Sequence, residues 1–179
     1  MNNEEMKKLK AEYAKSQRYG AHFICASLVI WLFIFAVGFS SLSQYYKNML
    51  SLYSSALLVP LALLFCKILK IRFSEKDNPL NTAGLVFALN QLLYLIIVIM
   101  VWLIKPEQML TAYAIVVGAH FLPYSWLYNS TVYRIVAIVI PVLSFVLALM
   151  KYTAVIPVVM IAADIVMIII FLSKTRRQG

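Results

Sequence analysis

Polar side chains that could do chemistry occur in the middle of otherwise apolar segments of this 179-residue chain. Asp164 stands within the run Ile161–Val166 and is the only acidic residue inside any of these segments. A charged group at the centre of a bilayer costs about 2.5–3.5 kcal/mol on insertion scales, so such groups normally face a protein interior or a cavity. Because joining helices does not need a carboxylate, we expect Asp164 to bind a proton or a cation.

Further polar residues lie at a similar depth in neighbouring segments. Asn90 and Gln91 are near the middle of one segment, and His120 is near the middle of the next. Asn90 with Tyr94, and His120 with Tyr124, are four residues apart and therefore share one face of a helix. The sequence thus predicts a substrate or ion site formed by one group of residues: Asp164, His120, Asn90, Gln91, Tyr94 and Tyr124.

Each of these residues also has a purely structural interpretation. Asn90 or Gln91 could only join helices through hydrogen bonds, which contribute about 0.6 kcal/mol in measured cases. His120 could be a neutral side chain bonded to a backbone carbonyl that Pro123 leaves free, and Asp164 could stay protonated as a packing group. Arg134, at the start of its segment, can reach lipid headgroups and is our headgroup-binding candidate.

Six apolar segments must position these residues, and each is long enough to cross a membrane. They are Ala21–Phe39, Met49–Cys66, Thr82–Ile104, Met109–Tyr128, Val132–Met150 and Ala154–Ser173. A helical span needs roughly 20 apolar residues. Of the chain's residues, 63% are hydrophobic and 13% are charged, whereas soluble domains contain about 45–50% apolar and about 25% charged residues. This composition excludes a soluble enzyme and a disordered chain. The segments lack the alternation of apolar and polar residues that is typical of a β-barrel. The sequence therefore predicts an all-α bundle of six transmembrane helices.

The residues that flank the spans predict the domain boundaries. Over Asn3–Arg18, the residues Met6, Leu9 and Tyr13 share one face, which is typical of an amphipathic helix on a membrane surface. A frayed tail is the alternative. We therefore expect residues 1–20 to form a cytoplasmic amphipathic segment, residues 21–173 the six-helix domain and residues 174–179 a basic tail.

The distribution of positive charge predicts the orientation. Of the 16 lysines and arginines, all but Lys47, Lys105 and Lys151 fall on one side of a six-span arrangement. Positive residues gather on the cytoplasmic side of short loops, so we expect a multi-pass protein of the plasma membrane with both termini cytoplasmic. The net charge of +9 then indicates contact with anionic headgroups rather than with nucleic acid.

Small residues predict where helices approach closely. They are spaced four apart in two successive segments: Gly84 with Ala88, and Ala114 with Gly118. Such pairs allow close backbone contact in membranes, and the short connection Lys105–Gln108 makes the two segments antiparallel neighbours. We expect the last segment to pack beside them and to bring Asp164 within reach of His120 or Asn90.

Aromatic residues at the segment ends predict an interfacial belt, as is usual in membrane proteins. The belt would contain Tyr45, Tyr46 and Tyr53 at one face and Tyr124, Trp126, Tyr128 and Tyr133 at the other. Cys25 and Cys66 have no metal-binding spacing, so we expect free thiols. The sequence contains no phosphate-binding loop or hydrolase motif. We therefore expect no metal or other cofactor, and an enzyme is the less favoured class.

The stretch Gly118–Tyr124, with Asn90 upstream, resembles a group of small bacterial integral membrane proteins of unknown function. The resemblance covers most of the chain and implies a polytopic membrane fold, but no activity and no functional residues. Three functions stay open: a small proton- or cation-linked transporter, a structural or accessory protein whose polar groups only pack helices, and a membrane-embedded lipid-modifying enzyme with His120 as base. A small ion or small molecule as ligand, and a homo-oligomer, fit the sequence equally.

Overall fold

The computed structural model describes residues 2–73 and 78–177, and in that part of the chain six helical spans are long and apolar enough to cross a membrane. The helices are α1 (Asn3–Ser16), α2 (Ala21–Gly38), α3 (Gln44–Ser54), α4 (Leu58–Leu69), α5 (Leu80–Ile104), α6 (Met109–Leu127), α7 (Thr131–Leu149) and α8 (Ile156–Arg177). Short 3-10 turns precede four of them: η1 (Arg18–Gly20), η2 (Ser55–Leu57), η3 (Pro106–Gln108) and η4 (Thr153–Val155). The predicted all-α, six-span architecture is confirmed.

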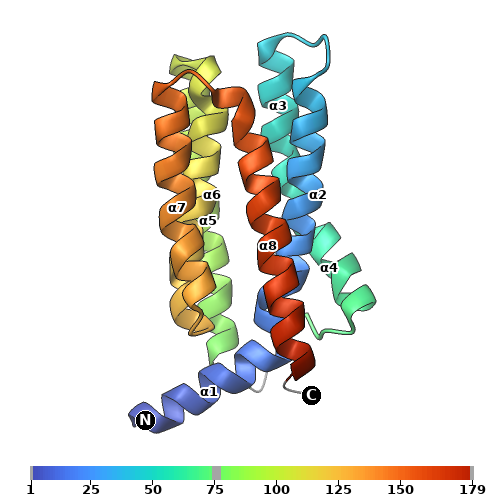
Figure 1. Cartoon of the computed structure of the whole chain (residues 1–179), viewed down its shortest axis with the longest axis vertical. Coiled ribbons are helices and arrows are strands. Elements are labelled where there is room, and N and C mark those ends of the chain that lie inside the picture. Colours follow the sequence, from blue (N-terminus) through green and yellow to red (C-terminus); the bar gives the residue numbers. More distant parts are fainter. Residues whose placement is uncertain (1, 74–77, 178–179) are drawn as a thin grey trace.

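The six spans form two groups of three that lie side by side (Figure 1). In the α2/α8 group, α2 packs against α8 on one side and against α3 and α4 on the other. In the α6/α7 group, α6 packs against both α5 and α7. Contacts between the groups are fewer and run mainly from α8 to α6 and α7. The groups therefore combine spans 1, 2 and 6 with spans 3, 4 and 5, and do not correspond to the first and second halves of the chain.

The second span is interrupted by η2, and α4 leaves the bundle at an angle to α3 (Figure 1). Proline has no N–H with which to continue the hydrogen-bond ladder, and Pro60 lies in the first turn of α4. The hydroxyl of Ser55 donates to the carbonyl of Leu52 at 2.6 Å, a back-bonding geometry that often bends helices. This bend separates α4 from α5 and leaves space inside the bundle.

Helix α1 lies across the end of the bundle that carries both termini (Figure 1). It begins at a capping box, in which Asn2 and Glu5 exchange two hydrogen bonds of 2.8 Å. Its Tyr13 is buried in the core, and the ammonium of Lys10 lies 3.4 Å from the centre of the Trp126 ring of α6. The amphipathic helix predicted for this region is therefore present, and its apolar face packs on the bundle.

The turn that joins α1 to α2 has three successive residues in the left-handed region. The φ angles of Arg18, Tyr19 and Gly20 are 45°, 56° and 73°. Such angles are strained for residues other than glycine and persist only where surrounding contacts impose them. Here the Tyr133 hydroxyl donates to the Tyr19 carbonyl at 2.7 Å, and the amide of Gln17 donates to the Arg72 carbonyl at 3.0 Å. The turn is thus held by α7 and by the segment after α4.

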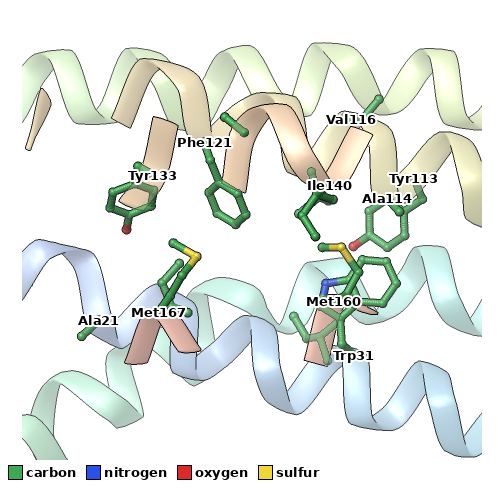
Figure 2. Close-up of a cluster of buried hydrophobic side chains, with 14 of the residues drawn as sticks. Ala21, Trp31, Tyr113, Ala114, Val116, Phe121, Tyr133, Ile140, Met160 and Met167 are labelled. Carbon is green, nitrogen blue, oxygen red and sulfur yellow. The ribbon is translucent and has the colours of Figure 1, made fainter. Parts of the chain in front are cut away.

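The hydrophobic core joins the two groups. Figure 2 shows methionines of α8 pointing from the α2/α8 group toward side chains of α6 and α7: Met160 and Met167 face Phe121, Tyr133 and Ile140. Both methionines are fully buried. Because methionine is unbranched and adapts to irregular spaces, it suits a contact between groups that meet over a limited area.

Of the two small-residue pairs, one does not lie where the sequence predicts. Gly118 lies against α7 rather than α5, since a Cβ atom there would be 2.6 Å from Cγ2 of Ile140. Gly84 does lie near α6, although its closest neighbour is the Tyr13 hydroxyl of α1, 3.2 Å from an added Cβ. α5 and α6 are neighbours as predicted, but the tightest helix contact at Gly118 belongs to the α6–α7 pair.

Candidate functional site

A cavity of about 570 Å³ lies inside the bundle, between the two groups. One wall comes from α2, η2 and the start of α4, and the opposite wall from α5 and α6. Tyr13 and Gln17 of the α1 region line it at the end that carries the termini. The bend at η2 contributes directly, because Ser55 and Leu58 are among the lining residues.

Three of the predicted site residues line this cavity: Gln91 on α5, and His120 and Tyr124 on α6. The His120 and Tyr124 rings are in edge contact, with centroids 5.0 Å apart. His120 is buried, and its Nδ1 atom has no hydrogen-bond partner in the part of the chain that is described. The Tyr124 hydroxyl donates to the Gly84 carbonyl at 3.3 Å, which joins α6 to α5. His120 and Tyr124, which the sequence places on one helix face, thus both lie on the cavity wall that α6 forms, and their role in binding stays a prediction.

Asn90 and Tyr94 are not among the lining residues. The face of α5 turned to the cavity carries Gln91 together with Ala88 and Leu95, which fits helical spacings of three and four residues. Asn90 is half-buried and Tyr94 is 42% exposed on the outside of the bundle. Arg134 is also exposed, at the start of α7, and does not line the cavity. Its contact with headgroups stays a prediction.

Asp164 is fully buried beside the cavity, without lining it. Neither of its carboxyl oxygens has a well-formed hydrogen bond to the described residues. The polar side chains close enough to interact with it are Ser27 and Cys25 on α2 and Tyr133 on α7. Ser27 and Tyr133 also line the cavity. Ser27 and Tyr133 are therefore residues that both interact with the carboxyl and form part of the cavity wall.

The expected packing of spans 3, 4 and 6 is wrong for the last span. α8 packs chiefly on α2 and meets α6 only at a few positions. The sequence did indicate that a lipid-facing carboxylate is unfavourable, and Asp164 does point away from lipid. It could not indicate which helix covers it, because every apolar helix offers a similar surface to its neighbours. Ser27 on α2 was missed for this reason.

A stack of tyrosines at the end of the cavity was also missed. Neighbouring rings are stacked, with centroids 5.8 Å apart for Tyr13 and Tyr128, 6.0 Å for Tyr124 and Tyr128, and 5.6 Å for Tyr128 and Tyr133. Tyr128 and Tyr133 are buried, so the interfacial-belt interpretation is wrong for them, whereas Trp126 is 49% exposed. The spacing of four from His120 through Tyr124 to Tyr128 was the available signal, because it places all three on one helix face.

The cavity suits a small, largely apolar molecule that also forms hydrogen bonds. Aliphatic and aromatic side chains make up most of its surface, and Gln17, Ser27, Gln91 and His120 supply amide, hydroxyl and imidazole groups. Most ligand pockets combine an apolar lining with a few polar groups that orient the ligand. Within residues 2–73 and 78–177, no group of three or more His, Cys, Asp or Glu side chains could hold a metal ion. The cysteines of that region, Cys25 and Cys66, are free thiols as expected.

The comparisons with known proteins identify a family and assign no activity. No curated protein and no solved structure matches the chain. The profile of a family of unknown function, DUF7010, matches residues 6–174, which includes five spans, most of the sixth and all residues that line the larger cavity. The uncharacterised group suspected from the sequence is thereby confirmed: the chain belongs to the DUF7010 family.

Proposed function

We propose that the protein is a small proton- or cation-linked transporter whose substrate site is the intramembrane cavity. The observation that carries this proposal is a space of about 570 Å³ between two groups of spans, next to a fully buried carboxyl without a hydrogen-bond partner among the described residues. A protein whose polar groups only pack helices would have them paired, as about 90% or more of buried polar groups are. Asp164, His120 and Ser144 do not fit that expectation.

The arrangement suggests how an ion and a substrate are linked. Asp164 carries the exchangeable proton or binds the cation, and Ser27 and Tyr133, which interact with its carboxyl, also line the cavity. Alternating access in many transporters is rocking of one group of helices against another around a central site. Here the two groups meet mainly along α8, the helix that carries Asp164. A change of charge on this carboxyl therefore acts at the contact between the groups.

The lipid-modifying alternative receives less support from the geometry. It requires His120 as a base close to Arg134 at the headgroup level, but Arg134 is exposed and is not part of the cavity lining. His120 instead points to a cavity shared with Gln91 and Tyr124. We therefore favour a function in binding and transport over a catalytic function.

Access of water to the cavity tests the proposal, because a transport site must open to water and a packing defect need not. In a variant in which Cys25 and Cys66 are replaced by serine, Gln91→Cys should react with a membrane-impermeant, positively charged thiol reagent added to membranes. Tyr94→Cys is the matched control, since it lies on the same helix but faces outward at 42% exposure, where lipid should shield it. If neither cysteine reacts from either side, the cavity is dry and the transport proposal fails.

A further inference from the structure

A second cavity, of about 190 Å³, lies at the end of the bundle where both chain termini are found. It is formed where three elements end or begin: the turn before α2, the end of α4 and the end of α8 (Figure 1). Its lining residues are Arg18, Leu69, Leu172, Thr175 and Arg176. None of them contributes to the larger cavity inside the bundle, so the two sites are separate.

The lining of this cavity is strongly positive. Its described lining residues include two guanidinium groups and no carboxylate, and neither Arg18 nor Arg176 forms an ion pair within residues 2–73 and 78–177. A guanidinium presents five N–H donors in a planar fork that matches the oxygens of a phosphate group. Thr175 is uncharged, and its hydroxyl donates to the Phe171 carbonyl at 2.8 Å, so it does not offset the positive charge of the arginines. Two arginines that face one cavity without an ion pair among the described residues therefore favour a phosphate-bearing anion.

The fold holds one of these arginines in an unusual backbone conformation. Arg18 has a φ angle of 45° and begins the left-handed turn between α1 and α2. Hydrogen bonds from Tyr133 to Tyr19 and from Gln17 to Arg72 fix the turn on both sides. The Arg18 side chain therefore starts from a fixed position, while Arg176 reaches the same cavity from the last turns of α8.

The remaining lining residues are apolar and belong to membrane-spanning helices. Leu69 ends α4, and Leu172 lies one turn before Arg176 on α8. Both are half-buried, so they offer a hydrocarbon surface directly beside the guanidinium groups. A soluble phosphate would use only the arginines, whereas a phospholipid would use the arginines for its headgroup and the leucines for the start of its acyl chains.

We propose that this cavity binds the phosphate group of an anionic phospholipid, with Arg18 and Arg176 as headgroup ligands and Leu69 and Leu172 in contact with the acyl chains. At about 30 Å³ per water molecule, its 190 Å³ has room for a phosphate ester. The bound lipid joins the turn after α1 to the ends of α4 and α8, and thereby stabilises this end of the bundle.

Lipid retention by the full-length protein tests the proposal. The protein is purified in detergent, phosphatidylglycerol or zwitterionic phosphatidylcholine is added, and bound lipid is counted by native mass spectrometry while the unfolding temperature is recorded. Phosphatidylglycerol should be retained and should raise the unfolding temperature, and phosphatidylcholine should do neither. Arg18→Gln and Arg176→Gln should each weaken retention of phosphatidylglycerol by about tenfold, which corresponds to about 1.4 kcal/mol.

Two controls distinguish a specific lipid-binding site from general electrostatic attraction between the protein and anionic lipid. Lys8→Gln removes one positive charge from an exposed position on α1 and should leave retention unchanged. Equal retention by wild type and the Arg18→Gln, Arg176→Gln double variant, or an equal loss in Lys8→Gln, would overturn the proposal. Inorganic phosphate is the third arm: if it raises the unfolding temperature as much as phosphatidylglycerol does, the occupant is a soluble phosphate compound and the lipid assignment is wrong.

Discussion

Replacement of Asp164 by asparagine separates an ion-exchanging carboxyl from a packing group. The two side chains have nearly the same shape, and Asp164 is 0% exposed without a hydrogen-bond partner in the described residues. An amide can still form hydrogen bonds, but it cannot exchange a proton or carry a negative charge. If the substrate site is linked to an ion through this carboxyl, Asp164→Asn should fold normally and abolish the ion-linked flux.

The structure sets the expected change in stability. An unpaired polar group in a protein interior costs about 1–3 kcal/mol, and asparagine leaves a similar group unpaired. The unfolding free energy of Asp164→Asn should therefore stay within about 1 kcal/mol of wild type when the carboxyl is neutral at rest. An ionised, unpaired carboxylate would cost several kcal/mol more. A strong stabilisation by Asp164→Asn would thus refute a neutral resting state.

The assay is proton flux into liposomes that contain purified protein and a trapped pH-sensitive dye, with a membrane potential imposed by a potassium gradient and valinomycin. Wild type should acidify the lumen faster than empty liposomes, and Asp164→Asn should match the empty liposomes. Ser144→Ala is the control, because Ser144 is also fully buried and unpaired within the described chain but does not line the cavity. Equal flux in wild type and Asp164→Asn would refute the role of Asp164 and would favour an accessory protein.

Three further predictions concern packing and orientation. Gly118→Ala should lower the unfolding free energy by about 1–3 kcal/mol, because its Cβ would be 2.6 Å from Ile140 Cγ2. Gly38→Ala is the control and should not destabilise the protein, because no atom lies within 4 Å of a Cβ added there. Equal thermal unfolding of the two variants would contradict the α6–α7 contact. Tyr133→Phe removes the 2.7 Å hydrogen bond to the Tyr19 carbonyl and should lower the unfolding free energy by about 0.5–1.5 kcal/mol. Denaturant unfolding in detergent can measure this change, and an unchanged unfolding free energy would show that this bond does not hold the turn. In a cysteine-free background, Ser41→Cys should react with a membrane-impermeant thiol reagent from outside intact cells, and Ser16→Cys should not. Both positions are exposed; Ser16 is the last residue of α1 and Ser41 follows α2, and these two helices end at opposite ends of the bundle. The opposite labelling pattern would show that the orientation is reversed.

The sequence by itself determined the class of fold and the number of spans. Each apolar segment is of span length, and a backbone in hydrocarbon must satisfy its hydrogen bonds within the segment, so helices were the one solution for these segments. The apolar face of Met6, Leu9 and Tyr13 similarly sufficed to predict α1. These properties depend on residues that are close along the chain.

The cost of burying a charge also predicted that Asp164 avoids lipid, and helical spacing placed His120 and Tyr124 on one face. Which helices cover these residues was decided only by the tertiary structure. The hydrophobic effect does not distinguish lipid from a neighbouring apolar helix, so association depends on detailed packing. Met160 and Met167 of α8 fit the core between the groups, and the bend at η2 moves α4 aside. That packing places Asp164 against α2 rather than α5, and it creates the cavity between the two groups of spans.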